Sequence, residues 1–401
     1  MTEIFAGIRV LDVAQNTFGP AAAGVLADFG ADVIKVEHPV RGDPQRGLVT
    51  AAIQPSIGDV NLGMAQVNRG KRSIGLDLTS PEGAGVLAKL VGSSDVLITN
   101  TLPATAAKLG IDEPTIRVMN ASIVYARASG FGARGAQAGD RAYDSTAYWA
   151  RGGIAQSLAR DDARPPQPLP AFGDRVGAMN LAFGITAALL RRARTGEGAT
   201  VDVSLLGTAL WQNSSTTVYS MALGSDWRNR SATVTNPLSA MYQSSDKRWL
   251  SLAMLESDRF WADFCEKIGR LDLVDDPRYA DSRARAGHAD ELVAELQRVF
   301  ETATLLEWRE RFATLEGAWA PYLTSLEAVE DAQAIANDYV VPVDYGMAEP
   351  VRLLPPPVQF DGRPPDLERA PELAEHGEQI LLELGYTWDD IVALHDAEVI
   401  T

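Results

Sequence analysis

The sequence has few of the residues that form disulfide bonds and metal centres. Among 401 residues there is one cysteine, Cys265, and only four histidines, at positions 38, 288, 376 and 395. A single thiol cannot form an internal disulfide bond, and the histidines lack the i, i+4 spacing of a helical zinc site. We therefore expect no metal centre, and we expect any catalytic chemistry to rest on carboxylates.

Basic runs and long apolar runs are also lacking. The chain has 36 Lys and Arg against 53 Asp and Glu, which gives a formal net charge of −17 at pH 7. No stretch forms the basic stripe that nucleic acids need, and no apolar run approaches the roughly 18 residues of a membrane span. The first 15 residues do not resemble a secretory signal. We expect an acidic, cytoplasmic protein without nucleic-acid or membrane partners.

What the sequence does contain is an alternation of short apolar runs and helical stretches over its first 135 residues. A long helix rich in Ala and Leu follows from Asp174, and it ends at Gly196 before one more strand. Strand-like runs lie at 8–13, 32–37, 72–78, 95–99, 122–127 and 199–205. This pattern predicts an α/β fold in which a mostly parallel sheet is covered on both faces, with ligands at the carboxyl ends of the strands.

The domain organisation follows from a change in composition. Residues 225–242 are polar and rich in turn-forming residues, which predicts a linker. We expect a large domain over residues 1–224 and a small α/β domain with its linker over 225–330. A return linker and C-terminal helices over 331–401 complete the large domain.

Several common nucleotide and nucleophile motifs are missing. The segment after the first strand reads QNTFGP instead of the GxGxxG of dinucleotide-binding proteins. The sequence also has no P-loop lysine motif and no GxSxG nucleophile elbow. Ordinary NAD binding, kinase activity and α/β-hydrolase activity are therefore disfavoured.

The segments that remain have the order of one known family. They are GIRVLDVAQNTFGPAAAGVLADFGADVIKVEHP, NRGKRSIGLDLTSPEG, SDVLITNTLPATAAKLG, YARASGFG, AYDSTAYWARGG, FGD and RRARTGEGATVDVSL. Together they resemble the family III CoA-transferases, the CaiB/BaiF family that contains formyl-CoA:oxalate CoA-transferase. The resemblance runs from about residue 7 to 205 and resumes in the C-terminal helices.

The resemblance implies an architecture and a set of substrates. It implies a Rossmann-like large domain joined to a smaller α/β domain, in a homodimer whose two chains are interlocked. The substrates are an acyl-CoA donor and a carboxylic acid acceptor, and no metal, ATP, redox group or other permanent cofactor is needed.

The resemblance also makes Asp174 the catalytic nucleophile, because this residue stands in the family's GD motif. From position alone, an aspartate at a helix start is more often an N-cap. The helix dipole and free backbone N–H groups are expected to keep its carboxylate ionised, as attack on a thioester requires. By resemblance, the reaction passes through a mixed anhydride and an aspartyl-CoA thioester.

Positions that match the family's coenzyme A contacts can also be named. Two of them, Lys71 and Arg72, add local positive charge, and Lys108 and Arg141 match basic positions that face phosphates; any of the four could equally be a solvated surface cation. The complete set is Gln15, His38, Lys71, Arg72, Leu76, Thr79, Asn100, Thr101, Lys108 and Arg141.

Two alternative functions stay open. The racemase branch of the family uses a histidine immediately before the aspartate that matches Asp144, and here that position is Tyr143. A tyrosine, with an ordinary pKa near 10, is a poor base at neutral pH, so transfer is favoured over α-proton exchange. The other alternative is a protein that binds CoA without turnover.

Overall fold

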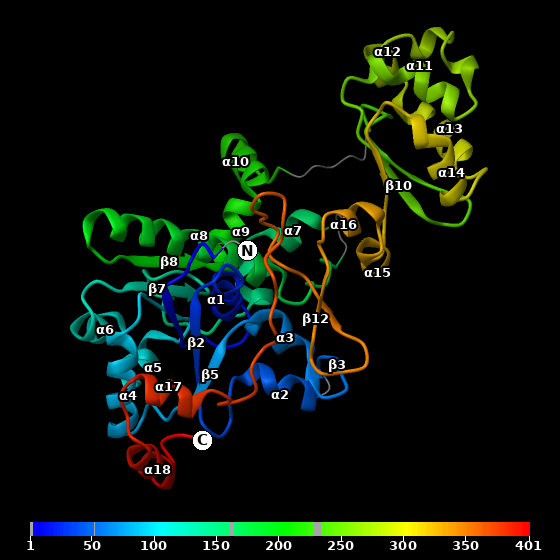
Figure 1. Cartoon of the computed structure of the whole chain (residues 1–401). Helices are drawn as coiled ribbons and strands as arrows, with labels where there is room; N and C mark the ends of the chain where they lie inside the picture. Colours follow the sequence, from blue (N-terminus) through cyan, green and yellow to red (C-terminus); the bar gives the residue numbers. More distant parts are fainter. Residues whose placement is uncertain (1–2, 52, 160–163, 228–233) are drawn as a thin grey trace. The chain divides into compact units, whose positions relative to one another are not determined.

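The computed structural model describes residues 3–51, 53–159, 164–227 and 234–401 (Figure 1). The chain divides into a large unit, made of the residues up to Trp227 and those from Gln333 to Thr401, and a small unit that ends at Ala332. Part of the linker expected at 225–242, residues 228–233, lies outside the described residues.

A six-stranded parallel sheet forms the centre of the large unit. Its order is β5-β2-β1-β6-β7-β8, so the chain runs outward from β1 in one direction and then outward from β6 in the other. This is the Rossmann order, and its switch point lies between β1 and β6. The strands are β1 (Arg9–Asp12), β2 (Asp32–Glu37), β5 (Arg72–Gly75), β6 (Val96–Thr99), β7 (Val124–Ser129) and β8 (Thr200–Ser204).

Successive strand residues belong to two different cores because side chains alternate between the faces of a sheet. Val10 packs in the core that includes residues of α1 (Phe18–Asp28) and α8 (Phe172–Thr195). Leu11 packs in the other core, with residues of α4 (Pro81–Gly92). The predicted α/β fold, with a parallel sheet buried on both faces, is confirmed.

The remaining helices of the large unit surround this sheet. Ser80 caps α4, since its hydroxyl oxygen accepts a hydrogen bond of 3.0 Å from the Gly83 N–H. The helices are α2 (Pro44–Thr50), α3 (Leu62–Asn68), α5 (Pro103–Lys108), α6 (Glu113–Met119), the π-helical segment η1 (Asp144–Arg151), α7 (Ile154–Leu158), α9 (Leu205–Gln212), α10 (Ser214–Leu223), α17 (Gly377–Glu383) and α18 (Trp388–Asp396).

Short antiparallel strands and the C-terminus complete the unit. The chain's last residues extend the sheet edge, because Leu76 forms an antiparallel bridge with Ile400. Strand β5 ends at Gly75, three residues before the end of the strand predicted over 72–78. The two hairpins are β3 (Ser56–Ile57) with β4 (Val60–Asn61), and β12 (Val341–Val343) with β13 (Val351–Leu353).

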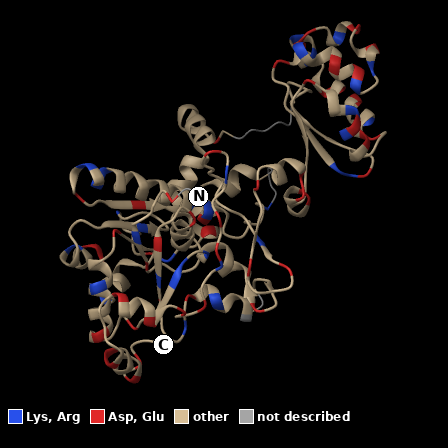
Figure 2. Ribbon diagram, viewed as in Figure 1, with Lys and Arg blue, Asp and Glu red and all other residues tan. Residues whose placement is uncertain are grey.

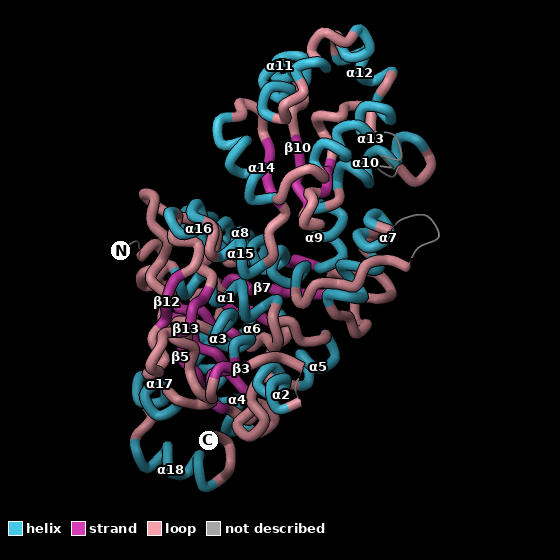
Figure 3. Tube along the Cα trace, turned by 90° about the vertical axis from the view of Figure 1, so that its right-hand side faces the viewer, coloured by secondary structure: helices cyan, strands magenta, loops and turns pink. Residues whose placement is uncertain are grey.

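The small unit has a core of its own. Its antiparallel sheet has the order β11-β10-β9 and is accompanied by a group of helices (Figure 3). Tyr242, Phe264, Phe300 and Trp308 are fully buried there. The elements are β9 (Met241–Gln243), β10 (Trp249–Leu252), α11 (Ser257–Lys267), α12 (Ser282–Gly287), α13 (Ala289–Phe300), α14 (Leu305–Arg311), β11 (Trp319–Pro321) and α15 (Ser325–Val329), with α16 (Ala332–Ala336) at the boundary.

Charged residues of both signs are spread over the helices of both units (Figure 2). The consecutive helices α9 and α10 are among those that contain no Lys, Arg, Asp or Glu. Among the described helices, none is long and apolar enough to cross a membrane.

Candidate active site

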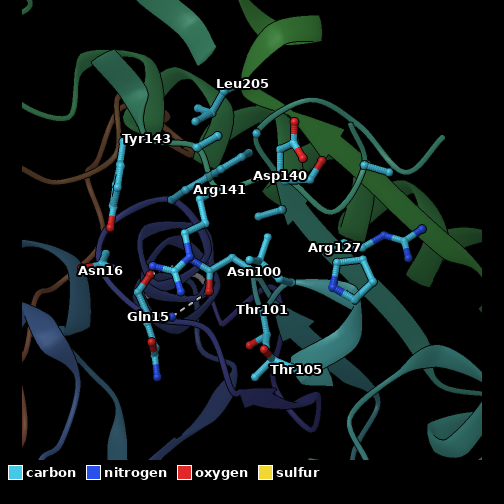
Figure 4. Close-up of a pocket in the computed structure, with 18 of the residues that line it drawn as sticks. Gln15, Asn16, Asn100, Thr101, Thr105, Arg127, Asp140, Arg141, Tyr143 and Leu205 are labelled. Atoms are coloured by element: carbon cyan, nitrogen blue, oxygen red, sulfur yellow. Dashed lines mark hydrogen bonds between the residues drawn. The ribbon is translucent and has the colours of Figure 1, made fainter. Parts of the chain in front are cut away.

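A cleft of about 350 Å³, here called the main cleft, opens at the carboxyl ends of β1, β6 and β7. Its floor is formed by Gln15 and Asn100, which follow β1 and β6, the two strands of the switch point. The Gln15 N–H donates a hydrogen bond of 2.9 Å to the Asn100 side-chain oxygen, and the Asn100 side-chain nitrogen donates one of 2.7 Å to the Gln15 carbonyl oxygen. Tyr143 and Arg127 lie on opposite sides of the cleft in Figure 4.

The turn that carries Gln15 rests on a group of buried charges, here called the ion network (Asp12, Lys35, Asp43 and Lys71). The Lys35 ammonium lies 2.8 Å from the Asp43 carboxylate and donates a hydrogen bond of 3.0 Å to the Ala14 carbonyl oxygen. Asp43 in turn accepts a hydrogen bond of 3.0 Å from the Asn16 N–H. These bonds hold Asn16 in the left-handed backbone region, at a φ of 62°.

Asp174 lies in the first turn of α8 but is not its N-cap. The helix begins at Phe172, and Ala171 is the N-cap residue. The Gly173 N–H donates to the carboxylate of Asp144, which η1 places beside the helix start, at 3.1 Å and 3.2 Å. Gly173 must be a glycine for this approach, because a Cβ there would clash with Asp144 and with the Tyr148 ring.

The carboxylates of Asp144 and Asp174, here called the carboxylate pair, lie near one cation, Arg175, whose charge lowers the pKa of Asp174 by less than burial raises it. Neither residue has a salt bridge to any residue that the structure describes, and none of those residues donates a hydrogen bond to Asp174. Burial, followed by the nearby negative charge of Asp144, raises the pKa of Asp174 to about 7. Burial also raises the pKa of Asp144. The expectation that the helix start keeps Asp174 fully ionised is not met, because the Gly173 N–H donates to Asp144 instead and the pKa of Asp174 is raised to about 7.

A second depression, here called the side hollow, begins at the same carboxylate. It has a volume of about 380 Å³ and shares Tyr143 and Asp174 with the main cleft. Asp174 is thus accessible from both cavities. The side hollow is lined by Tyr143, Asp144, Ser145, Pro168, Leu169, Pro170, Ala171 and Asp174.

Four of the residues predicted to contact coenzyme A line the main cleft together with Asp174. Gln15 and Asn100 form its floor, and Thr101 follows Asn100 at the end of β6. Arg141 is exposed and lies in the segment before η1. The structure therefore brings these polar groups and the proposed nucleophile into one cavity.

Three of the predicted contacts lie elsewhere. Lys71 is fully buried in the ion network, where all three of its N–H bonds are used, by Asp12 at 2.7 Å, the Pro20 carbonyl at 2.7 Å and the Asn68 side chain at 2.8 Å. Lys71 is therefore a structural residue with no donor left for a phosphate.

Arg72 and Leu76 are the other two corrections. Arg72 starts β5, at the amino end of the sheet, and its guanidinium is bound to Asp32 at 2.7 Å and to Glu383 at 2.8 Å. Leu76 is 2% exposed and belongs to the core beneath α4, so its side chain cannot contact an adenosine.

The last three predicted contacts lie near the carboxyl edge of the sheet but do not line the main cleft. The Nδ1 atom of His38 accepts hydrogen bonds from the backbone N–H groups that follow it, and the Thr79 hydroxyl donates to Asp77 at 2.7 Å. Lys108 is exposed at the end of α5, whereas Thr105 of the same helix lines the cleft.

Arg127 is a cleft residue that the sequence reasoning did not select. It lies on β7 and lines the main cleft, and its Nε donates a hydrogen bond of 2.6 Å to Asp202 of β8. The sequence did contain an indication of this residue, because a charged side chain near the carboxyl end of an otherwise apolar buried strand is unusual. Among the described residues, no group of three or more His, Cys, Asp or Glu could hold a metal ion.

Comparison with known proteins identifies the class that this fold and cleft belong to. The description of CoA-transferase family III matches residues 5–377, so the chain belongs to that family. Its members are enzymes that act on CoA thioesters, and the sequence-based assignment to this family is confirmed.

Individual relatives cover nearly the whole chain. The cinnamoyl-CoA:phenyllactate CoA-transferase of Clostridium sporogenes is 31% identical over 98% of this chain and 96% of its own. The (R)-2-hydroxy-4-methylpentanoate CoA-transferase of Clostridioides difficile is 30% identical over 99% of both chains. A solved CaiB/BaiF family protein from Brucella suis superposes with a TM-score of 0.82 at 28% identity, covering 94% of this chain and 98% of its own.

Proposed function

We propose that this enzyme moves CoA from an acyl-CoA to a carboxylic acid through covalent intermediates on Asp174. The observation that carries the proposal is the position of this carboxylate, which has no hydrogen-bond donor among the described residues and is open to two cavities. A carboxylate without partners keeps its lone pairs available for attack on a carbonyl carbon.

The proposed reaction exchanges one bond for another at each step. Asp174 attacks the thioester carbonyl, so that a C–O bond forms, the C–S bond breaks and CoA thiolate leaves. The thiolate then attacks the aspartyl carbonyl, which releases the donor acid and leaves an aspartyl-CoA thioester. The acceptor carboxylate attacks this thioester and frees the thiolate, which takes the acceptor acyl group from the resulting anhydride. One thioester replaces another, so the exchange needs no permanent cofactor.

The main cleft is the proposed site of the CoA portion. CoA carries several phosphate charges, and Arg141 supplies a guanidinium group for them within the cleft, whereas Arg127, which also lines it, is paired with Asp202 at 2.6 Å. Gln15, Asn100 and Thr101 present amide and hydroxyl groups to the polar pantetheine chain. His38, Thr79 and Lys108 are proposed for the outer, adenosine end because they lie near the same edge of the sheet but outside the cleft.

Acceptor acids can be chosen from the relatives. One has phenyllactate in its name and the other 2-hydroxy-4-methylpentanoate, so carboxylic acids with these side chains are the first acceptors to test.

A homodimer is also proposed, on the strength of an exposed apolar surface. Leu210 and Trp211 of α9 and Val218, Met221 and Leu223 of α10 are each at least 45% exposed. Exposed apolar patches of this kind mark interfaces. Light scattering coupled to size-exclusion chromatography tests the dimer, and a monomeric wild type contradicts it. Trp211→Glu together with Met221→Glu should weaken a dimer that uses this surface.

The covalent step is tested by intact-protein mass spectrometry after mixing the enzyme with acyl-CoA. We expect a mass increase of one CoA less one water on the peptide that contains Asp174. The adduct should be lost with hydroxylamine and should be absent in Asp174→Asn. Solvent deuterium entering the α position of the acyl group, with no adduct, would instead support proton transfer in which Tyr143 takes part. Binding of CoA without adduct or deuterium uptake would indicate a protein without turnover.

A further inference from the structure

The side hollow differs from the main cleft in both lining and charge. Half of its lining residues belong to the segment Pro168-Leu169-Pro170-Ala171, whose side chains are all apolar. No Lys, Arg or His is among the described residues that line it. The two prolines restrict the backbone, and the Ala171 carbonyl oxygen accepts a hydrogen bond of 3.2 Å from the Arg175 N–H, which ties the segment to α8. The wall is therefore preformed.

The geometry of a thioester sends its CoA portion and its acyl chain in different directions from Asp174. The sulfur and the acyl chain leave the carbonyl carbon in directions about 120° apart, as at any trigonal carbon. If the CoA portion fills the main cleft, the acyl chain must leave Asp174 in another direction. The side hollow begins at Asp174 and at Tyr143, which are also its two points of contact with the main cleft.

The charges decide which portion goes where. The main cleft is lined by Arg127 and Arg141 as well as by Asp140 and Asp174, whereas no cation lines the side hollow among the described residues. Arg127 is paired with Asp202, so Arg141 is the cation that the main cleft offers to a phosphate of CoA. A carboxylate at the far end of an acyl chain would meet the same lack of cations, and it would also approach the buried carboxylate of Asp144. An unpaired charge of this kind is costly to desolvate, whereas an apolar chain gains free energy there.

On the basis of the proposed function, we propose that the side hollow binds the acyl group and selects monocarboxylic acids with an apolar side chain over dicarboxylic acids. Leu169 is the specificity-determining residue, because it is the largest apolar side chain of the proline-bounded segment and is 57% exposed.

The test compares the rates at which two probe thioesters, 4-methylpentanoyl-CoA and succinyl-CoA, form the CoA adduct on Asp174. The wild type should react at least about tenfold faster with the apolar probe. Leu169→Ala should slow that reaction about tenfold, and the volume-conserving Leu169→Met should restore most of it. Leu169→Arg should speed the reaction of succinyl-CoA several-fold by pairing with its free carboxylate.

A matched control is Leu190→Ala, which removes a leucine of similar exposure, 54%, from α8 itself. It lies about 24 Å from Asp174 along the helix axis and should leave both rates unchanged. Adduct formation at equal rates with both probes overturns the assignment of the side hollow and leaves the proposed function intact. The same conclusion follows if Leu169→Ala behaves like Leu190→Ala. If neither probe forms an adduct, both the proposed function and the assignment are overturned.

Discussion

The ion network and the carboxylate pair are two groups of carboxylates near the same edge of the sheet, with opposite surroundings. Asp12 and Asp43 are fully buried, and each has a lysine ammonium within 2.8 Å. Asp144 and Asp174 have no salt bridge to any residue in the described part of the chain, and Asp144 relies on a backbone N–H at 3.1 Å.

This difference indicates that the two groups have different roles, one structural and one in the proposed chemistry. In the ion network, two ammonium groups face two carboxylates, and Lys35 and Asp43 fix the turn at Gln15 and Asn16, although burial still lowers the pKa of Lys71 to about 8. In the carboxylate pair, desolvation is left uncompensated, which raises the pKa of Asp174 to about 7. Perturbed and unpaired groups of this kind are typical of functional sites. The structure thus fixes the turn at Gln15 and Asn16 with paired charges, and it leaves the Asp174 carboxylate without a salt bridge to a described residue where two cavities meet.

The largest expected effect comes from replacing the partly buried carboxylate of Asp174. Asp174→Asn should lower CoA exchange by about 10⁴-fold or more, since it removes the proposed nucleophile. It should not destabilise the protein: at pH 8 the free energy of unfolding should stay the same or rise by on the order of 1 kcal/mol, because a buried unpaired charge is removed. Activity assays and urea unfolding measure the two effects.

Asp290→Asn is the matched control for this change. Asp290 also lies in the first turn of a helix, α13, but is exposed in the small unit. Its substitution should change neither activity nor stability by a measurable amount. A clear loss of stability in Asp174→Asn would show that Asp174 is a structural group like the members of the ion network.

Removing a charge from the ion network should, in contrast to Asp174→Asn, lower the free energy of unfolding. Lys35→Met leaves Asp43 without its cation, whereas Asp12 keeps Lys71 at 2.7 Å, and removal of one partner from a buried pair costs about 3–5 kcal/mol. We expect that loss in the free energy of unfolding, measured by urea titration, whereas Lys108→Met on the exposed end of α5 should change it by less than about 0.5 kcal/mol. A loss below about 1 kcal/mol for Lys35→Met would mean that the buried charges do not support each other.

The same contrast explains what the sequence could and could not predict. Gln15, Asn100 and Asp174 line the main cleft together, and their positions follow from local patterns, namely the ends of strands and the start of a helix. Lys71 and Arg72 were misplaced because their partners are distant in sequence. Asp12 is 59 residues from Lys71, and Glu383 is 311 residues from Arg72. The sequence gives the charge of a lysine or arginine, but it does not show whether a distant segment supplies an acidic partner for that charge.

The order of strands and helices was predictable because alternation and caps are local signals, and the sheet has the expected parallel form. The side hollow was not predictable. Its wall depends on how residues 168–171 turn into α8 and on the position of η1, and neither is encoded in a periodic pattern. Arg127 was overlooked for a similar reason, since strand periodicity does not show where a long side chain reaches.

A smaller effect should appear in the pH dependence of kcat/KM. Because the pKa of Asp174 is raised to about 7, the reactive carboxylate is lost as the pH falls below that value, and kcat/KM should fall about tenfold per pH unit. Asp144→Asn removes the neighbouring negative charge but keeps an oxygen for the Gly173 N–H, so the pKa of Asp174 should fall. The acid limb of the kcat/KM profile should then move to lower pH by about one unit.

The sign of the stability effect follows from the same shift. The folded pKa of Asp174 lies above its unfolded value, so the protonated form is favoured in the folded state and the stabilisation is lost as the pH rises from about 4 to about 7. Asp174→Asn should therefore gain stability relative to the wild type across that window and keep a constant difference above it. A pH–rate limb that does not move in Asp144→Asn contradicts the coupling between the two carboxylates.

The smallest effect concerns the turn that the ion network holds. Asn16 adopts a φ of 62°, a conformation that glycine accepts freely and that costs alanine about 1 kcal/mol. Asn16→Gly should therefore keep the stability of the wild type, while Asn16→Ala should lose about 1 kcal/mol and raise the KM for acyl-CoA a few-fold with little change in kcat. Urea unfolding and steady-state kinetics measure the two effects. The asparagine side chain is missing from both variants, so only the backbone conformation separates them. If both variants raise KM equally, it is the amide of Asn16 and not the geometry imposed by Asp43 that serves the main cleft, and the ion network then has a purely structural role.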